Sequence, residues 1–113
     1  LEFRRVLFRS DVLVNQCNMS AVDFMKLVSE NPAKLYGMYP KKGTLAVGSD
    51  GDITIVDKHI EHVLSKESAH TKADYIPYEG ISVTGKVRDV ILRGHHVVQD
   101  GSLTESYLGE CIP

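Results

Sequence analysis

Histidines are the residues of this sequence best suited to hold a metal ion or to move a proton. His59 and His62 are three residues apart, and Asp57 and Glu61 stand beside them. On a helix this spacing would place the two imidazoles on one face, where the carboxylates could complete a metal site. The segment does not have the pattern of a helix, so we predict solvated histidines here and no metal.

The other three histidines are no better placed. His95 and His96 are adjacent beside Arg93, and in a strand they would point to opposite faces, so they could not share one metal ion. His70 stands alone, and the chain contains neither an HxH pair nor an HExxH motif.

Nucleophile and phosphate-binding motifs are also missing. There is no GxSxG, GxGxxG or Walker A run. Cys17 and Cys111 are far apart and have no histidine nearby in the sequence, which favours buried or incidental thiols. Asp50 and Asp52 flank a turn glycine but lack the further carboxylates of a calcium loop. We therefore predict no catalytic, cofactor-binding or metal-ligating residue in this chain.

Charge and composition exclude several classes of protein. The chain has 113 residues, with 13 Lys+Arg against 15 Asp+Glu and a formal net charge of −2. This charge excludes the basic footprint of a nucleic-acid-binding domain, and no apolar run approaches the ~18 residues that span a bilayer. With 42% hydrophobic and 25% charged residues, the sequence is typical of one small soluble domain. Two cysteines without a disulfide framework indicate a reducing, cytoplasmic location.

Residues 1–10 differ in composition from the remainder, because they carry three arginines among apolar residues. They lack the cleavage pattern of a secretory signal and are short for an amphipathic targeting segment. We interpret them as a non-native leader from cloning or sequencing. The alternative is a native strand or helix start.

Helices are predicted within residues 11–40. Ser20 suits an N-cap with Asp23 as its capping-box partner, and the spacing of the apolar residues predicts one buried face, made of Ala21, Phe24, Met25 and Val28. Asn31 would end this helix and cap a second one, with Pro32 in its first turn. The second helix would end at Gly37, and its apolar contacts would be Ala33, Leu35, Tyr36 and Met38.

Beyond residue 41 the apolar pattern changes to the period of two that is typical of strands. The expected strands are residues 44–47, 52–57, 81–84, 87–92 and 96–99, with an irregular strand over 59–70. Glycines mark the turns at residues 48–51 and at Arg93-Gly94. Residues 75–80 are predicted to form a loop that packs its tyrosines onto the sheet.

Two sequence blocks carry a family resemblance. The first is NPAKLYG at residues 31–37, followed by YPKKGTLAVGSDGDI at residues 39–53. The second is DYIPYEG at residues 74–80, followed by Gly85, Arg93-Gly94 and Asp100-Gly101. In order and spacing these blocks resemble the C-terminal region of the dihydropyrimidinase/hydantoinase family, the cyclic-amide hydrolases of the amidohydrolase superfamily. The departures are Gly51 for the usual Ala, Ile76 for the usual Asn, and Glu110 for a small or basic residue.

The resemblance implies an α+β fragment of a larger fold. It assigns residues 11–40 to the terminal helices of a (β/α)8 barrel and residues 41–113 to the C-terminal, antiparallel part of a small β-sandwich. It further implies a binuclear zinc centre in the parent protein, held by an HxH pair, a carboxylated lysine, two further histidines and an aspartate, all of them upstream of this chain. We expect the upstream barrel segment as its partner, in a homo-oligomer, with no nucleic acid and no membrane.

Three other interpretations stay open. The chain could come from an allantoinase or dihydroorotase relative, or from a non-catalytic dihydropyrimidinase-like structural or signalling protein. It could also be an independent small β-domain that acts as a binding module.

Overall fold

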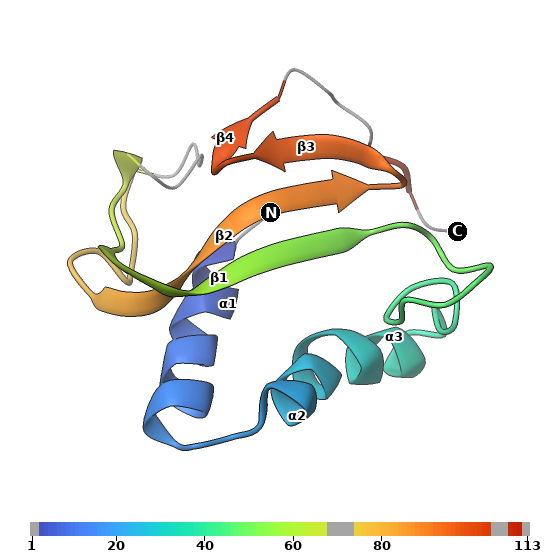
Figure 1. Ribbon diagram of the computed structural model, residues 1–113, viewed down its shortest axis with the longest axis horizontal. Coiled ribbons are helices and arrows are strands. Elements are labelled where there is room, and N and C mark those ends of the chain that lie inside the picture. The colour runs from blue at the N-terminus through green and yellow to red at the C-terminus, as the bar shows by residue number, and fades with distance from the viewer. Residues whose placement is uncertain (1–2, 68–73, 105–108, 112–113) are drawn as a thin grey trace.

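The computed structural model describes residues 3–67, 74–104 and 109–111. Its first half is helical, with two rods that meet at a bend (Figure 1). The first rod joins α1 (Phe3–Ser10) to a wider helical turn, η1 (Asp11–Gln16). The second rod runs without a break through α2 (Ala21–Met25), the wider turn η2 (Lys26–Glu30) and α3 (Asn31–Leu35). In the described ranges, no helix is long and apolar enough to cross a membrane.

The second half is an antiparallel sheet of four strands in the order β1-β2-β3-β4, so that each strand pairs with its neighbour in sequence (Figure 1). The strands are β1 (Ile53–Val63), β2 (Ser82–Leu92), β3 (His95–Gln99) and β4 (Ser102–Leu103). The described residues thus form helices followed by one antiparallel sheet, which confirms the α+β class. The barrel and sandwich assignments belong to the proposal made below.

Two-residue turns connect the last three strands. Arg93 and Gly94 have φ of 49° and 83°, and Asp100 and Gly101 have φ of 49° and 79°. Two successive positive φ values give the turn whose twist matches the strands it joins. The predicted turn at Arg93-Gly94 is confirmed.

The core lies between α1 and the sheet. Its buried members are Leu7, Leu64, Val83, Val87, Val90 and Val98. Phe8 of α1 stacks on Tyr78 of the loop before β2, with ring centroids 4.9 Å apart. Residues 3–10 form the helix α1, and Leu7 of this helix is only 5% exposed. That residues 1–10 are a non-native leader stays a prediction.

The second rod corrects the predicted pair of helices. Ser20 is the N-cap, as expected, and its Oγ accepts a hydrogen bond from the backbone N–H of Asp23 at 3.1 Å. Asn31 is not a cap, because Glu30 and Asn31 both have helical backbone angles and the helix continues through them. The wider turns of η2 relieve the clash that a proline ring makes with the preceding turn, so Pro32 is tolerated here.

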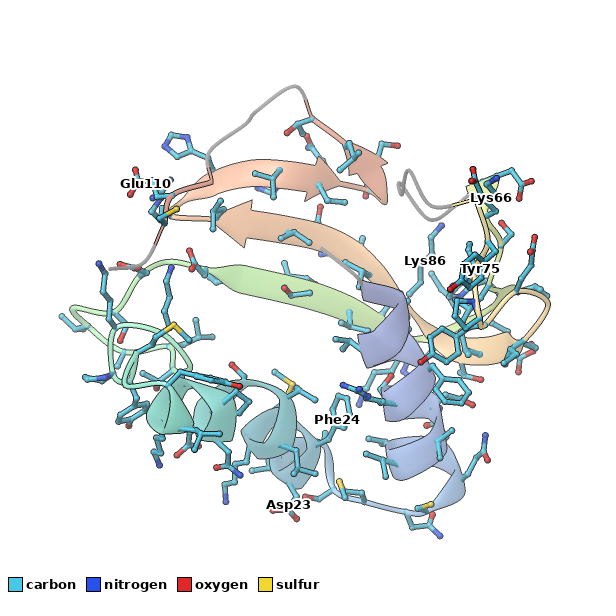
Figure 2. The ribbon with its side chains drawn as sticks, turned by 180° about the vertical axis from the view of Figure 1, so that it is seen from behind. Asp23, Phe24, Lys66, Tyr75, Lys86 and Glu110 are labelled. Atoms are coloured by element: carbon cyan, nitrogen blue, oxygen red, sulfur yellow. The ribbon has the colours of Figure 1, made fainter. Side chains whose placement is uncertain are left out.

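The buried face predicted for this rod is only partly right. Phe24 is 5% exposed and points toward the space between the rods (Figure 2). Met25 is 54% exposed and Ala21 is exposed, although both lie in α2, before the wider turns of η2 begin, and Val28 of η2 is half-buried. In α3, Ala33 is buried while Leu35 and Tyr36 are exposed. The rod ends at Gly37 as predicted, with a φ of 68°.

The predicted strands need three corrections. Residues 44–47 are not a strand: no described strand pairs with them, and the N–H of Ser49 turns back to the carbonyl of Ala46 at 3.0 Å. Residues 52–57 and the start of 59–70 form one strand, β1, whose pairing with β2 is irregular between Asp57 and Glu61. Residues 81–84 and 87–92 merge into β2 through Gly85, whose φ is 126°. Residues 96–99 are confirmed within β3.

Candidate functional site

The strand β1 separates the histidines that a helix would have brought together. His59 and His62 lie in β1 at and just after the irregular pairing with β2; His59 is exposed, whereas His62 is half-buried. Asp57 is also turned away from this role, since its Oδ1 accepts a hydrogen bond from the backbone N–H of His59 at 2.9 Å. Among the residues that the structure describes, no group of three His, Cys, Asp or Glu side chains could hold a metal ion.

His62 is half-buried rather than solvated, which corrects the prediction for that residue. Its Nδ1 is shielded from solvent and has no hydrogen-bond partner in the described structure. Burial, and after it the positive charge of Lys86, lower the pKa of His62, so its imidazole is neutral near pH 7.

The remaining sequence candidates also stay apart. His95 and His96 are both exposed on β3, and His70 lies outside the described residues. Cys17 and Cys111 are free thiols and both are exposed, so neither is a buried thiol. The two tyrosines of the loop before β2 differ in burial. Tyr78 packs against the core, whereas Tyr75 is 74% exposed.

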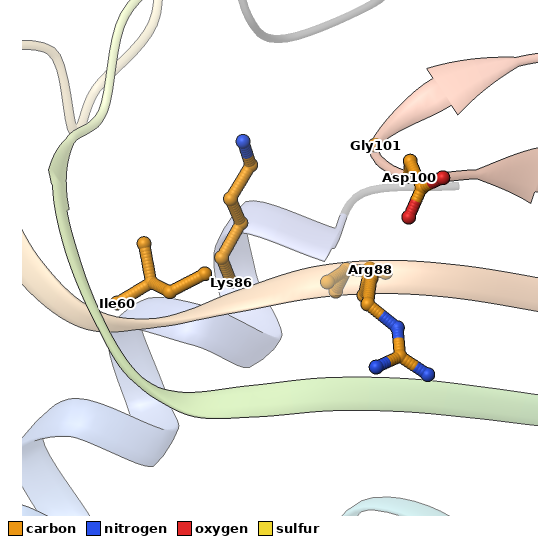
Figure 3. Close-up of a pocket in the computed structure, with 6 residues that line it drawn as sticks. Ile60, Lys86, Arg88, Asp100 and Gly101 are labelled. Carbon is orange, nitrogen blue, oxygen red and sulfur yellow. The ribbon is translucent and has the colours of Figure 1, made fainter.

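A shallow pocket of about 220 Å³ lies between β1, β2 and the β3–β4 turn (Figure 3). Its lining is Ile60, Lys86, Val87, Arg88, Asp100 and Gly101. The side chain of Lys86 extends toward the turn, while Nε of Arg88 is 2.6 Å from Oδ2 of Asp89. The charged side chains of the lining are Lys86, Arg88 and Asp100, and Arg88 is already paired with Asp89 outside the lining.

A polar cluster ties the long loop after α3 to the β2–β3 turn. Lys42 forms ion pairs with Asp52 and, at 2.8 Å, with Asp50. Asp52 in turn accepts a hydrogen bond from the backbone N–H of Arg93 at 2.9 Å, and Nη1 of Arg93 is 2.5 Å from Glu110. We call these five residues the loop clasp. The hydrogen bond from Lys42 lowers the pKa of Asp50, and the pKa of Lys42 is raised, first by Asp50.

The loop clasp explains what Asp50 and Asp52 do. Their carboxylates pair with the ammonium group of Lys42, and that of Asp52 also accepts a hydrogen bond from the backbone N–H of Arg93. The two aspartates could be singled out from the sequence, but their partners could not, because neither Lys42 nor Arg93 is a neighbour of Asp50 or Asp52 in the sequence. The clasp is therefore structural.

Asp11 is a second polar group that the sequence did not single out. It is 9% exposed, and its carboxylate accepts hydrogen bonds from Asn15 at 2.9 Å, from Gln16 at 3.0 Å and from the backbone N–H of Thr84 at 3.1 Å. These bonds, the one from Asn15 first, lower the pKa of Asp11. Asp11 thus joins the first helical rod to β2.

The described residues therefore combine helices, an antiparallel sheet and structural ion pairs, without a catalytic constellation. The model of the amidohydrolase family matches residues 2–97, and the chain belongs to this family. A D-hydantoinase of Ralstonia pickettii is 44% identical over 97 residues, which are 86% of this chain and 20% of that protein. A D-hydantoinase of Geobacillus stearothermophilus is 43% identical over 95 residues, 84% of this chain and 20% of that protein.

Solved structures agree with the sequence comparison. A dihydropyrimidinase from Brevibacillus agri superimposes with a TM-score of 0.82 at 38% identity, over 86% of this chain and 21% of that one. An L-hydantoinase (dihydropyrimidinase) from Arthrobacter aurescens gives a TM-score of 0.75 at 36% identity, over 80% of this chain and 20% of that one. The chain spans about a fifth of the length of the relatives it matches.

The structure gives a role to two of the three departures from the family pattern. Ile76 is 5% exposed, so an apolar side chain is accommodated inside the loop before β2. Glu110 pairs with Arg93 and extends the loop clasp. Gly51 has no such role: a Cβ built there would lie 3.5 Å from the N of Gly94, an ordinary contact that alanine would also make.

Proposed function

We propose that this chain is the C-terminal structural portion of a metal-dependent cyclic-amide hydrolase of the hydantoinase/dihydropyrimidinase type. The observation that carries the proposal is the 44% identity to a D-hydantoinase over 97 residues, joined to a TM-score of 0.82 with a dihydropyrimidinase structure. In both relatives the matched stretch is about a fifth of the protein.

The reaction of the whole protein would be the opening of a cyclic amide such as a dihydropyrimidine or a 5-substituted hydantoin. Water adds to the ring carbonyl and the ring C–N bond breaks, which leaves a carboxylate and a ureido group. A divalent metal pair would activate the water. The described residues do not fit such a centre, because they hold no group of three metal-ligating side chains, so no step of the reaction is assigned to them.

The part of this chain in the whole protein would be architectural. The two helical rods would complete the wall of a barrel, and the four-stranded sheet would form one layer of a sandwich beside it. The loop clasp fixes the connection between these two parts, since Lys42 follows α3 and Asp52 immediately precedes β1. The upstream barrel segment of the same polypeptide would be the partner of the helices, and the whole protein would assemble as a cytoplasmic homo-oligomer.

A graft tests this proposal. The 113-residue chain replaces the matched stretch of the Ralstonia pickettii D-hydantoinase, and the hydrolysis of a 5-substituted hydantoin is followed by the acid released. We expect activity within about tenfold of the parent enzyme, since volume-conserving exchange of related packing surfaces is tolerated.

Two controls make the graft informative. The same enzyme without the matched stretch should be inactive or insoluble, because a barrel deprived of its terminal helices exposes its core. A graft that is folded, metal-loaded and inactive would contradict the proposal. So would full activity of the enzyme that lacks the stretch altogether.

A further inference from the structure

Two peptide bonds of this chain join an aspartate to a glycine, the pair whose backbone rearranges most readily without an enzyme. They are Asp50-Gly51, in the loop between α3 and β1, and Asp100-Gly101, in the turn between β3 and β4. Because glycine has no Cβ, its backbone nitrogen can approach and attack the carboxyl carbon of the preceding aspartate. The hydrogen bonds of the two glycine nitrogens distinguish the two sites.

The attacking nitrogen is engaged at one site and open at the other. The N–H of Gly101 donates to the carbonyl of Arg88 at 2.8 Å, and the turn holds Asp100 at a φ of 49°. The N–H of Gly51 has no hydrogen-bond partner among the described residues, and Gly51 is exposed. Of the two nitrogens, only that of Gly51 is available for attack in the folded chain.

The carboxylate of Asp50 is the other reacting group, and Lys42 holds it. Nζ of Lys42 is 2.8 Å from Oδ2 of Asp50, and the two side chains are 20% and 22% exposed. The hydrogen bond from Lys42 lowers the pKa of Asp50, and the charges of Lys41 and Arg93 act in the same direction. An ionised carboxylate resists attack, because one of its oxygens must leave as water. The ion pair therefore opposes the reaction, both by its charge and by immobilising the carboxylate.

We propose that Asp50-Gly51 is a site of spontaneous isoaspartate formation and that Lys42 restrains the reaction. The nitrogen of Gly51 bonds to Cγ of the protonated Asp50 side chain, whose hydroxyl leaves as water with the proton of the N–H, and a five-membered succinimide forms. Water then adds to the main-chain carbonyl carbon of Asp50, the original peptide C–N bond breaks, and the chain continues through Cγ. One water leaves and one is added, so no other reactant is needed and the mass is unchanged.

The product would disrupt the loop clasp. Isoaspartate adds one carbon to the main chain and moves the carboxylate onto Cα. Lys42 pairs with both Asp50 and Asp52, and the N–H of Asp52 donates to the carbonyl of Asp50 at 2.9 Å, so a longer backbone between the two aspartates cannot keep this arrangement. The site would thus limit the lifetime of the link between α3 and β1. This inference does not depend on the function proposed above, and either can fail alone.

The test is prolonged incubation of the 113-residue chain at neutral pH, followed by tryptic digestion and mass spectrometry. Electron-transfer fragmentation distinguishes isoaspartate from aspartate. Trypsin releases residues 43–58 and residues 94–113, so both Asp-Gly bonds are measured in one digest. Isoaspartate should accumulate faster in residues 43–58. Lys42→Gln, in which trypsin cuts after Lys41 instead, should raise that rate about threefold, within the range that a partly exposed ion pair contributes.

Three variants serve as controls. Lys41→Gln removes the same charge from an exposed neighbour that lies outside the ion pair, so its rate should change less than that of Lys42→Gln. Lys42→Arg keeps a cation beside Asp50 and should react as slowly as the unchanged chain. Gly51→Ala restores the residue usual in the family and should nearly abolish the reaction. The fold tolerates this alanine, because the nearest atom to its Cβ is the N of Gly94 at 3.5 Å.

The outcomes separate the two parts of the proposal. In concentrated urea the two sites should react at similar rates, since the hydrogen bond of Gly101 and the ion pair of Asp50 are both lost. Isoaspartate that forms first at Asp100-Gly101 in the folded chain overturns the choice of site. Equal rates in Lys42→Gln and Lys41→Gln, or a Lys42→Arg rate as high as that of Lys42→Gln, overturn the restraint by Lys42.

Discussion

Replacing Gly43 by alanine should destabilise this fold more than any other glycine substitution in the loop after α3. A Cβ at this position would lie 2.5 Å from the Cβ of Ala33, 3.1 Å from the carbonyl oxygen of Ser29 and 3.3 Å from the Cα of Glu30. Ala33 is 3% exposed and lies in a helix, so it has no free direction in which to move. The loop would have to lift away from α3.

The size of the effect has two parts. Gly43 has a φ of 83°, a left-handed conformation that costs a residue with a Cβ about 1–2 kcal/mol. The overlap with a packed neighbour adds about 1–3 kcal/mol, the usual range for overpacking. Together these give a loss of roughly 2–5 kcal/mol in the free energy of unfolding, a large share of the ~5–15 kcal/mol that a domain has.

The assay is urea unfolding of the 113-residue chain, followed by circular dichroism at one fixed protein concentration. The matched control is Gly48→Ala, because Gly48 also has a positive φ (92°) but has nothing within 4 Å of the added Cβ. It should lose only the backbone part. A second background, Ala33→Gly, removes the main clash, so Gly43→Ala should cost less there. Equal losses for Gly43→Ala and Gly48→Ala would refute the packing argument.

Four further predictions follow from the structure. Gly94→Val should cost about 1–2 kcal/mol from backbone strain alone, since no atom lies within 4 Å of its added Cβ, whereas Gly94→Asn should be nearly neutral because asparagine tolerates a left-handed φ; equal urea midpoints for the two variants would show that the turn is assigned wrongly. The pKa of Asp11 is held below its usual 3.8, first by Asn15, so its carboxylate stabilises the fold above about pH 4 and this contribution is lost as the pH falls through the lowered pKa. Asp11→Asn should therefore flatten the acid limb of the stability–pH curve, and an unchanged limb would contradict the assignment. Calorimetric titration should find no stoichiometric zinc binding tighter than about 1 μM, and the melting temperature of the isolated chain should depend on protein concentration because its exposed apolar residues favour self-association; a tight site, or a sharp melt of a monomer at every concentration, would favour a self-sufficient domain. The full-length protein should open hydantoins or dihydropyrimidines faster than allantoin or dihydroorotate, and the reverse order in a substrate panel would place it among the sister enzymes.

Local chemistry made much of this fold predictable. The cap at Ser20, the end of the helix at Gly37 and the turn at Arg93-Gly94 each depend on a few neighbouring residues, and all three are confirmed. The strand at residues 96–99 is confirmed for the same reason, and residues 53–57 lie in the longer strand β1. Such features are decided within one turn of the chain, where residue type limits the backbone angles.

The errors come from interactions over longer distances. Asn31 has the chemistry of a cap, but the wider turns of η2 carry the helix past it. The strand expected at residues 44–47 has the right pattern but no described partner, and a strand exists only where another strand pairs with it. Met25 is exposed although it lies on the predicted face of the regular α2, because a periodic pattern marks a face but does not determine whether another element covers it. None of these facts is present in a window of neighbouring residues.

The histidines and the loop clasp show two different arrangements of polar side chains in a chain that spans about a fifth of its relatives' length. A catalytic metal centre in a barrel gathers ligands from the ends of several strands that lie far apart in the sequence. Here the chain brings distant charges together once, when Lys42, Asp52 and Arg93 meet, and the result is a neutralised contact between a loop and a turn. The described histidines, by contrast, lie along β1 and β3, and no three metal-ligating side chains gather among the described residues. Under the function proposed above, the ligands of a metal centre would come from the portion of the protein that this chain does not span.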